Sequence, residues 1–360
     1  MTAGHRRSLA RPTRGSARAG RSGGGAQAGR GCLVQIRACQ LPDGAFAQVP
    51  PGGRPDAPVW IAPYFAHFAA LALLAAHERG PNPGDLRRAE RWLAWCAKHQ
   101  APDGYWTDFE GTAAAYRDTG KVDAWDSSAA LFLRVAEGAR RAGGTVTPDT
   151  LAAAQRALAC LEKVTDADGL TWAKPDYRMK YLMDNVEVVA GLQAAAALFA
   201  AAGRAGQARQ AADQAGQAAR RLPEFWQAEE GSFAFARRAD GSWVVGPDKP
   251  YPRRLAQLYG LAFVEARADA WASVAKAFEP AAEPDAACGA AWWLAAASRQ
   301  NARDLPVWRA RAIAEAAAFS PQRTYLNRYA LSALALLEGA DWLSARPVNP
   351  RDAARHKSTP

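Results

Sequence analysis

The sequence is poor in the residues that build disulfide frameworks and metal centres. Its 360 residues include five Cys and five His. The cysteines are odd in number, widely scattered and contain no Cys-x-x-Cys pair, which argues against a disulfide framework and for a reducing compartment. No two histidines are four residues apart, as a zinc-binding helix would require. We therefore expect no disulfides, no metal site and no cofactor.

Segments that would direct the chain to a membrane or out of the cell are also missing. An Arg-Arg pair follows His5, but no apolar run of a signal peptide comes after it. The most apolar window, residues 186–202, is interrupted by Glu187, Gly191 and Gln193, so we predict a buried helix there rather than a membrane span. We expect a cytoplasmic protein with no membrane partner. A start codon assigned too far upstream would equally explain the unusual N-terminal segment.

Positive charge is concentrated at the two ends of the chain. The net charge is +10, yet residues 1–30 hold seven Arg and no acidic residue, and the last ten residues are also basic. The stretch between them is close to neutral, so a nucleic-acid partner is not expected. The Arg-, Gly- and Ser-rich start has no apolar anchor to offset its ordering entropy. We predict disordered tails over 1–30 and 346–360 and a single domain over 31–345.

An internal repeat is the most informative feature that is present. It consists of a Gln or Asp, a turn ending in Gly, and an aromatic residue two or three positions later, and it recurs about every 60 residues, a period that fits a helical hairpin. Its copies are Gln40-Leu-Pro-Asp-Gly44-Ala-Phe46, Gln100-Ala-Pro-Asp-Gly104-Tyr-Trp106, Asp166-Ala-Asp-Gly169-Leu-Thr-Trp172 and Gln227-Ala-Glu-Glu-Gly231-Ser-Phe233.

Between the repeats the apolar residues recur with helical periodicity, and Ala dominates. Eleven helices are predicted, ending at Pro and Gly punctuation. Their ranges are 62–78, 85–99, 125–142, 148–163, 184–202, 205–221, 252–268, 270–278, 286–299, 304–318 and 325–338. The best strands, 233–237 and 242–245, flank an Asp-Gly turn and predict a short hairpin.

Eleven or twelve helices in hairpins predict an all-α fold, an (α/α)6 toroid with short loop hairpins. In such a ring, six inner helices are surrounded by six outer ones, and one end is an open mouth. The loops that lead into the inner helices all reach that mouth, so acidic and aromatic side chains from distant positions can converge there. We expect the Asp-Gly-aromatic loops to line it.

Four segments resemble a known group of proteins, the six-hairpin glycosidase superfamily and its bacterial glycosidase-like members. They are Ile61-Ala-Pro-Tyr64-Phe-Ala-His67, Asp123-Ala-Trp-Asp126-Ser-Ser-Ala-Ala, Lys180-Tyr-Leu-Met-Asp184-Asn185-Val-Glu187-Val-Val-Ala-Gly and Tyr251-Pro252-Arg-Arg-Leu-Ala-Gln257-Leu-Tyr. The resemblance implies a carbohydrate-acting toroid of the glycoside hydrolase type, with an oligo- or polysaccharide as partner.

The candidate catalytic residues are carboxylates at predicted helix starts. Asp126 and Asp184 each precede an apolar helical run and are about one hairpin apart. Glycoside cleavage uses one carboxyl as general acid and commonly a second to activate water or attack carbon. Asp108, with Glu110 beside it, is a third candidate because its loop has no evident turn role. Helix capping is the alternative reading, since an acid at a helix start accepts backbone N–H groups.

Aromatic and polar side chains near the predicted mouth are the candidate saccharide contacts. Trp and Tyr rings stack on sugars, although they also fill protein cores. The candidates are Trp106, Trp125, Trp172, Tyr251, Tyr64, His67, Glu187 and Gln257.

Two other function classes remain open. A toroid that binds a saccharide or a protein without catalysis would account for the lack of a sharp catalytic motif. Triterpene cyclases carry Gln and Trp repeats of similar shape, but they use an Asp-x-Asp-Asp acid, whereas Asp123-Ala-Trp-Asp126 has two carboxylates at another spacing. The sugar, the linkage and the oligomeric state are not specified by these patterns.

Overall fold

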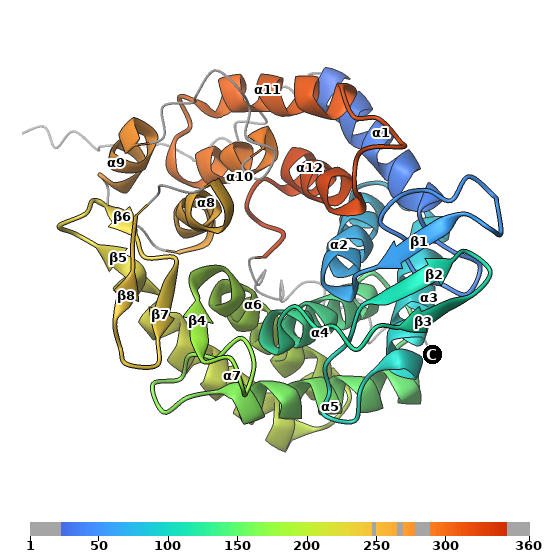
Figure 1. Ribbon diagram of the computed structural model, residues 1–360, viewed down its shortest axis with the longest axis horizontal. Coiled ribbons are helices and arrows are strands. Elements are labelled where there is room, and N and C mark those ends of the chain that lie inside the picture. Colours follow the sequence, from blue (N-terminus) through green and yellow to red (C-terminus); the bar gives the residue numbers. More distant parts are fainter. Residues whose placement is uncertain (1–22, 247–249, 265–268, 278–288, 344–360) are drawn as a thin grey trace, which may run out of the picture.

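A closed ring of helices forms the protein (Figure 1). The computed structural model describes residues 23–246, 250–264, 269–277 and 289–343. The inner helices are α2 (Pro63–Arg79), α4 (Trp125–Arg141), α6 (Leu182–Ala201), α8 (Leu255–Phe263), α10 (Ala290–Gln300) and α12 (Leu326–Glu338). The outer helices are α1 (Gly23–Ala38), α3 (Pro83–His99), α5 (Pro148–Val164), α7 (Ala205–Arg221), α9 (Ala270–Ala277) and α11 (Leu305–Ala317). Helix α12 packs against α2 and closes the ring, which confirms the predicted (α/α)6 toroid.

Burial separates the two layers. Helix α6 is buried on nearly all of its faces, whereas the outer helix α7 buries only Ala211, Ala215 and Ala218. By length and composition α6 could cross a membrane, but 78% of its apolar window is buried inside the ring. The buried helix predicted over this window is therefore confirmed.

Short strands lie at the end of the ring where the loops lead into the inner helices (Figure 1). Among the described residues they form three small antiparallel sheets. The sheets are β1 (Pro58–Ile61), β2 (Phe109–Thr112) and β3 (Tyr116–Asp118), then β4 (Met179–Tyr181), β7 (Ala236–Arg238) and β8 (Trp243–Val244), and finally β5 (Trp226–Gln227) and β6 (Ser232–Phe233). The predicted hairpin is present as β7 and β8, although its strands are shorter than expected. A 3-10 turn (Leu222–Phe225) precedes β5, and one π-helical turn (Pro250–Arg254) precedes α8.

Helix α1 corrects the predicted domain boundary. Residues 23–30, expected to be disordered, form the first half of α1, which packs against α11 and α12. Gly25 and Gly29 continue the buried stripe of Cys32, Leu33 and Ile36 at helical spacing. Packing of this face against α11 and α12 therefore overrides the low helix propensity of glycine. The predicted tail over 346–360 lies outside the described residues.

The repeat loops fasten outer helices to one another. Gln40 Nε2 donates to the carbonyls of Gly44 and Arg88, and Gln100 Nε2 donates to those of Gly104 and Ala153. Gly44 and Gly104 adopt φ values of +104° and +91°, and a Cβ at Gly104 would lie 2.1 Å from the Arg156 carbonyl oxygen. The repeat is thus a structural clamp that needs glycine.

The far end of the ring is filled by the segment after α12. Trp342 is 4% exposed, and its ring packs against those of Phe68, Phe263 and Trp292. Its carbonyl accepts a hydrogen bond from the guanidinium of Arg134 at 3.1 Å. Because Phe68 and Trp292 also line the central cavity, Trp342 forms the layer beneath its floor.

The closest crossing of inner helices gives a stability prediction. A Cβ on Gly191 of α6 would lie 2.5 Å from both Cα and the carbonyl oxygen of Ala130 on α4. Gly191→Ala should therefore lower the free energy of unfolding by about 1–3 kcal/mol, because backbone atoms must move apart. Gly138→Ala on α4 is the matched control, since its Cβ meets only the tip of Leu74 at 3.1 Å. Urea denaturation of the two variants measures the difference, and equal stabilities would contradict the crossing geometry.

Candidate active site

A cavity of about 730 Å³ opens inside the inner ring. Its wall comes mostly from the inner helices and the loops leading into them, and Glu315 of the outer helix α11 also lines it. The lining residues are Tyr64, Phe65, Phe68, Val122, Asp123, Ala124, Ser127, Ala173, Lys174, Tyr177, Tyr181, Met183, Asp184, Pro252, Leu255, Tyr259, Gly289, Ala291, Trp292, Glu315, Asn327, Arg328, Leu331 and Ser332. Carboxylates, cations and aromatic rings therefore share one concave site, as ligand sites commonly do.

Asp184 reaches the cavity from the first turn of α6. Strand β4 pairs with β7, and the amide of Leu182 donates to the carbonyl of Phe235 at 3.0 Å, which fixes the start of the helix. Asp184 lines the cavity but is only 9% exposed. Burial, together with the nearby charges of Asp126 and Glu187, raises the pKa of Asp184 well above its usual value. A carboxyl in this environment keeps its proton and can donate it.

Asp123 is the second carboxyl on the cavity wall. It lies two residues before α4, where the amide of Trp125 donates to the carbonyl of Ala173 at 2.8 Å. Asp123 is exposed at the cavity surface; desolvation by the surrounding wall raises its pKa, while the charge of Lys174, which also lines the cavity, acts to lower it. Asp123 was not predicted as a site residue, although it belongs both to a segment that resembles the six-hairpin glycosidases and to the cyclase-like spacing. Its position three residues before Asp126 at the same helix start was the available signal.

Asp126, a predicted catalytic residue, is fully buried and does not line the cavity. Its Oδ2 accepts from the hydroxyl of Thr171 at 2.7 Å, and its Oδ1 accepts from the amide of Ser127 at 2.8 Å. Burial raises the pKa of Asp126 to about 7, and the two hydrogen bonds oppose that effect. Asp126 therefore makes no contact with the cavity, but its charge helps to raise the pKa of Asp184.

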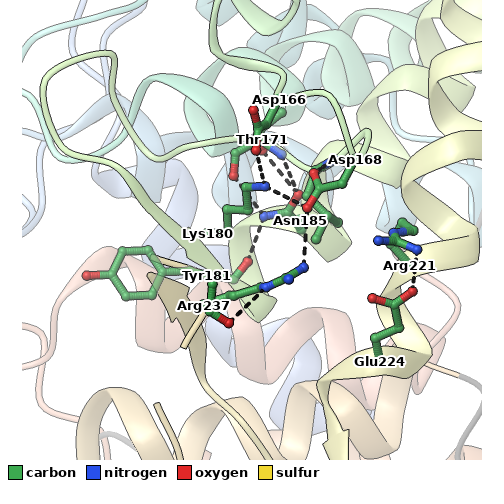
Figure 2. Close-up of polar contacts among 11 residues, drawn as sticks. Asp166, Asp168, Thr171, Lys180, Tyr181, Asn185, Arg221, Glu224 and Arg237 are labelled. Atoms are coloured by element: carbon green, nitrogen blue, oxygen red, sulfur yellow. Dashed lines mark hydrogen bonds and ion pairs between the residues drawn. The ribbon is translucent and has the colours of Figure 1, made fainter. Parts of the chain in front are cut away.

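A polar network behind the site holds the third repeat loop against β4 and α6 (Figure 2). The ammonium of Lys180 lies 2.6 Å from carboxylate oxygens of both Asp166 and Asp168. The side-chain Nδ2 of Asn185 donates to the carbonyls of Tyr181 and Thr171. Its Oδ1 accepts from the backbone amide of Thr171 at 2.8 Å. The network places the Thr171 hydroxyl where it meets Asp126.

Glu187 is one turn further along α6 and lies behind two tyrosines. Its Oε1 accepts from the hydroxyls of Tyr64 at 3.1 Å and Tyr259 at 2.7 Å, both of which line the cavity. Burial raises the pKa of Glu187 to about 8, although these two hydrogen bonds act to lower it. Glu187 does not line the cavity itself, and its buried carboxyl orients two groups that do.

The tryptophans predicted to line the mouth do not line the cavity. Trp106 is 2% exposed, and its indole donates to the carbonyl of Cys96 at 2.9 Å. Trp125 stacks on Tyr105 with the ring centroids 4.1 Å apart. The Trp172 ring lies under the ammonium of Lys180, 4.2 Å from its centroid. The expectation fails for Trp106 because its ring packs inward, away from the cavity, whereas Trp125 and Trp172 are half-buried against Tyr105 and Lys180.

Of the predicted catalytic carboxylates and polar contacts, only Asp184 lines the cavity. His67 is fully buried, accepts from the indole of Trp92 at 3.1 Å, and has its pKa lowered by burial to about 3. Gln257 pairs with the backbone of Phe233, accepting from its amide and donating to its carbonyl. Asp108 accepts from the indole of Trp60 at 3.1 Å and does not line the cavity.

Tyr64 is the one predicted aromatic contact that the structure places on the cavity wall. Tyr251 belongs to the π-helical turn before α8, and its side chain lies outside the described part of the chain. In the described ranges, no group of three or more His, Cys, Asp and Glu side chains is arranged to hold a metal ion.

No protein-family model and no curated protein matches the chain. Solved structures do. The GH76A α-1,6-mannanase of Salegentibacter sp. HEL1_6 is 12% identical, with a TM-score of 0.56 over 89% of this chain and 100% of the mannanase. A D-mannose isomerase is also 12% identical, with a TM-score of 0.56 over 84% of this chain and 88% of the isomerase.

A third structure, the unsaturated glucuronyl hydrolase of Bacillus sp. GL1, is 16% identical, has a TM-score of 0.43 and aligns over only 54% of either chain. The chain thus spans about half the length of this relative. The toroid that the chain shares with the mannanase is the fold of the six-hairpin glycosidases, which confirms the predicted resemblance at the level of the fold. Fold alone does not assign a reaction.

Proposed function

We propose that the protein hydrolyses a glycosidic bond of an oligo- or polysaccharide, with Asp184 as general acid and Asp123 as the second carboxyl. The observation that carries the proposal is the presence of these two acids, in different environments, on the wall of one aromatic-lined cavity. Pairs of acids whose surroundings separate their pKa values commonly divide the acid and base roles.

Asp184 supplies the proton in this scheme. The raised pKa keeps its carboxyl neutral at pH values where a surface Asp is ionised. As the bond from the anomeric carbon to the leaving oxygen breaks, Asp184 transfers its proton to that oxygen and becomes a carboxylate. Water then supplies the hydroxyl that ends on the anomeric carbon and the proton that restores Asp184.

Asp123 supplies the negative charge. The neighbouring cation of Lys174 favours its ionised form, in contrast to Asp184, around which the charges are negative. The carboxylate either removes from the attacking water a proton that then returns to Asp184 through solvent, or bonds to the anomeric carbon until water, deprotonated by Asp184, displaces it. Tyr64, whose hydroxyl donates to Glu187, offers its ring face to the sugar, while the buried Tyr259 supports the wall through the same carboxyl.

Structures of similar fold give the proposal its substrate class. The α-1,6-mannanase has been solved with α-1,6-mannotriose, and the isomerase is named for a hexose. A saccharide-binding toroid without catalysis would use the same cavity, so the test must detect bond cleavage as well as binding.

The test is cleavage of a panel of oligo- and polysaccharides in water labelled with oxygen-18. Hydrolysis creates new reducing ends that carry the label, whereas an aldose–ketose isomerisation creates none. The Asp123→Asn variant should lose cleavage by about 10²–10⁴-fold, the contribution of acid–base or nucleophilic catalysis.

Asp103→Asn is the matched control for that experiment. Asp103 is a half-exposed carboxylate that pairs with Lys163 on the outside of the ring. It should retain the activity of the wild type. The hydrolase proposal fails if the wild type binds saccharides but forms no labelled product, or if Asp123→Asn cleaves as well as Asp103→Asn.

A further inference from the structure

Exposed aromatic side chains are rare on this protein and occur beside the cavity. Among the described residues, four large hydrophobic side chains are exposed, and the two aromatic ones are Tyr177, 46% exposed, and Tyr325, 53% exposed. Tyr177 lines the cavity, and Tyr325 directly precedes α12, whose residues Asn327 and Arg328 line it. Single exposed rings are common on proteins, but rings beside a concave site present faces on which a sugar can stack.

A row of rings connects Tyr325 with the cavity. Its ring centroid lies 6.1 Å from that of Trp60 on β1, which lies 6.4 Å from that of Phe65. Phe65 in turn lies 5.2 Å from Tyr64, and both of these line the cavity. The hydrogen bond from the Trp60 indole to Asp108 fixes the central ring of the row. We refer to Tyr325, Trp60, Phe65 and Tyr64 as the β1 row.

A second row leaves the cavity at β4. The ring centroids of Tyr177 and Tyr181 are 6.4 Å apart, and that of Phe235 lies 5.8 Å beyond Tyr181. The two tyrosine hydroxyls are hydrogen-bonded at 3.0 Å, and the guanidinium of Arg253 lies over Phe235. We refer to Tyr177, Tyr181 and Phe235 as the β4 row.

The two rows lie across the mouth from each other. Figure 1 shows β1 and β4 on opposite sides of the ring, with the central space between them. Protein-binding surfaces generally have a continuous apolar centre. Here the rings are instead separated by a cavity that carries Asp123, Lys174 and Asp184. That arrangement suits a flexible polar chain that stacks on rings at intervals.

We propose that a saccharide chain crosses the mouth, with sugar units stacked on the exposed rings of both rows and one linkage inside the cavity. This inference rests on the proposed function and deepens it. The substrate is then a chain several units long, cleaved within its length, rather than a disaccharide or a single terminal residue.

The experiment measures binding along ladders of linear mannan, glucan and uronan oligosaccharides, from monosaccharide to octasaccharide, by titration calorimetry. Asp123→Asn protein is used so that no ligand is consumed. We expect affinity to rise with chain length until both rows are occupied. Tyr177→Ala and Tyr325→Ala should each weaken binding of the longest chain by about tenfold, as loss of one well-placed aromatic contact does. Both should leave binding of the shortest ligand nearly unchanged.

Val307→Ala is the control, because Val307 is similarly exposed, at 52%, but lies in the first turn of the outer helix α11 and does not line the cavity. It should bind every ligand as the parent protein does. Affinity that does not depend on chain length, tyrosine variants that bind long chains normally, or a purified protein partner that loses binding with the same variants while no glycan binds would overturn the inference. Length-dependent binding that the tyrosine variants lose, without any cleavage by the wild type, would support the rows and refute only the hydrolase proposal.

Discussion

Asp184→Asn should lower kcat for glycan cleavage by about 10²–10⁴-fold, because it removes the proton that the leaving oxygen requires. The substitution conserves the size of the side chain. Since the folded protein already holds Asp184 neutral, the neutral amide should change the free energy of unfolding by less than about 1 kcal/mol. Steady-state kinetics and urea denaturation on the same preparation measure the two effects.

A change of leaving group separates this role from that of Asp123. A nitrophenyl glycoside leaves without protonation, so Asp184→Asn should cleave it at close to the wild-type rate, whereas Asp123→Asn should be impaired on both substrates. Asp126→Asn is a further comparison, because it removes a nearby charge that raises the pKa of Asp184 but no group that touches the substrate. It should move the alkaline limb of the activity profile to lower pH. Equal loss on both substrates for Asp184→Asn would contradict the general-acid assignment.

Helical periodicity was sufficient to predict the ring. Ten of the twelve helices in the described residues begin within about three residues of their predicted positions, because apolar residues recur at helical spacing and Pro or Gly marks the ends. Helix α8 begins three residues late, after the π-helical turn. Helix α1 was not predicted, because its buried face begins with Gly25 and Gly29 and a Gly-rich composition is typical of disordered segments.

Only part of the cavity lining could be predicted from the sequence. Asp184 and Tyr64 were expected at the mouth and line the cavity. Asp123 and Asp126 stand at one helix start, and sequence cannot tell which of them faces the cavity, because that depends on Thr171, a residue 45 positions further along the chain that binds Asp126. The repeats pointed to the correct fold but to the wrong lining, since the same Gly turn that reaches the mouth directs Trp106 inward.

Acids buried inside the ring should make the stability of the protein depend on pH. Glu187 has a pKa of about 8 in the folded protein, against roughly 4.3 in an unfolded chain. Between these values the folded state holds a proton that the unfolded state has lost, so the stabilising effect is full below about pH 4 and is lost as pH rises toward 8. Asp126 and Asp184, whose pKa values are also raised, act in the same direction. Wild-type stability should therefore fall as pH increases through this window.

Glu187→Gln should remove one titrating group from that dependence. The slope of unfolding free energy against pH should become shallower by up to about 1.4 kcal/mol per pH unit, which is the contribution of one proton. The variant should match the wild type within about 1 kcal/mol near pH 5, where Glu187 is neutral and its Oε1 accepts the same two tyrosine hydroxyls as an amide oxygen would. Above pH 8 it should be the more stable protein. Asp213→Asn on the exposed face of α7 is the control and should keep the wild-type slope, because that carboxyl remains in water in both states. Denaturant titrations at a series of pH values provide the slopes. A Glu187→Gln slope equal to that of Asp213→Asn would mean that Glu187 is ionised in the folded protein, and the two tyrosines would then be held by a buried charge rather than by a neutral acid.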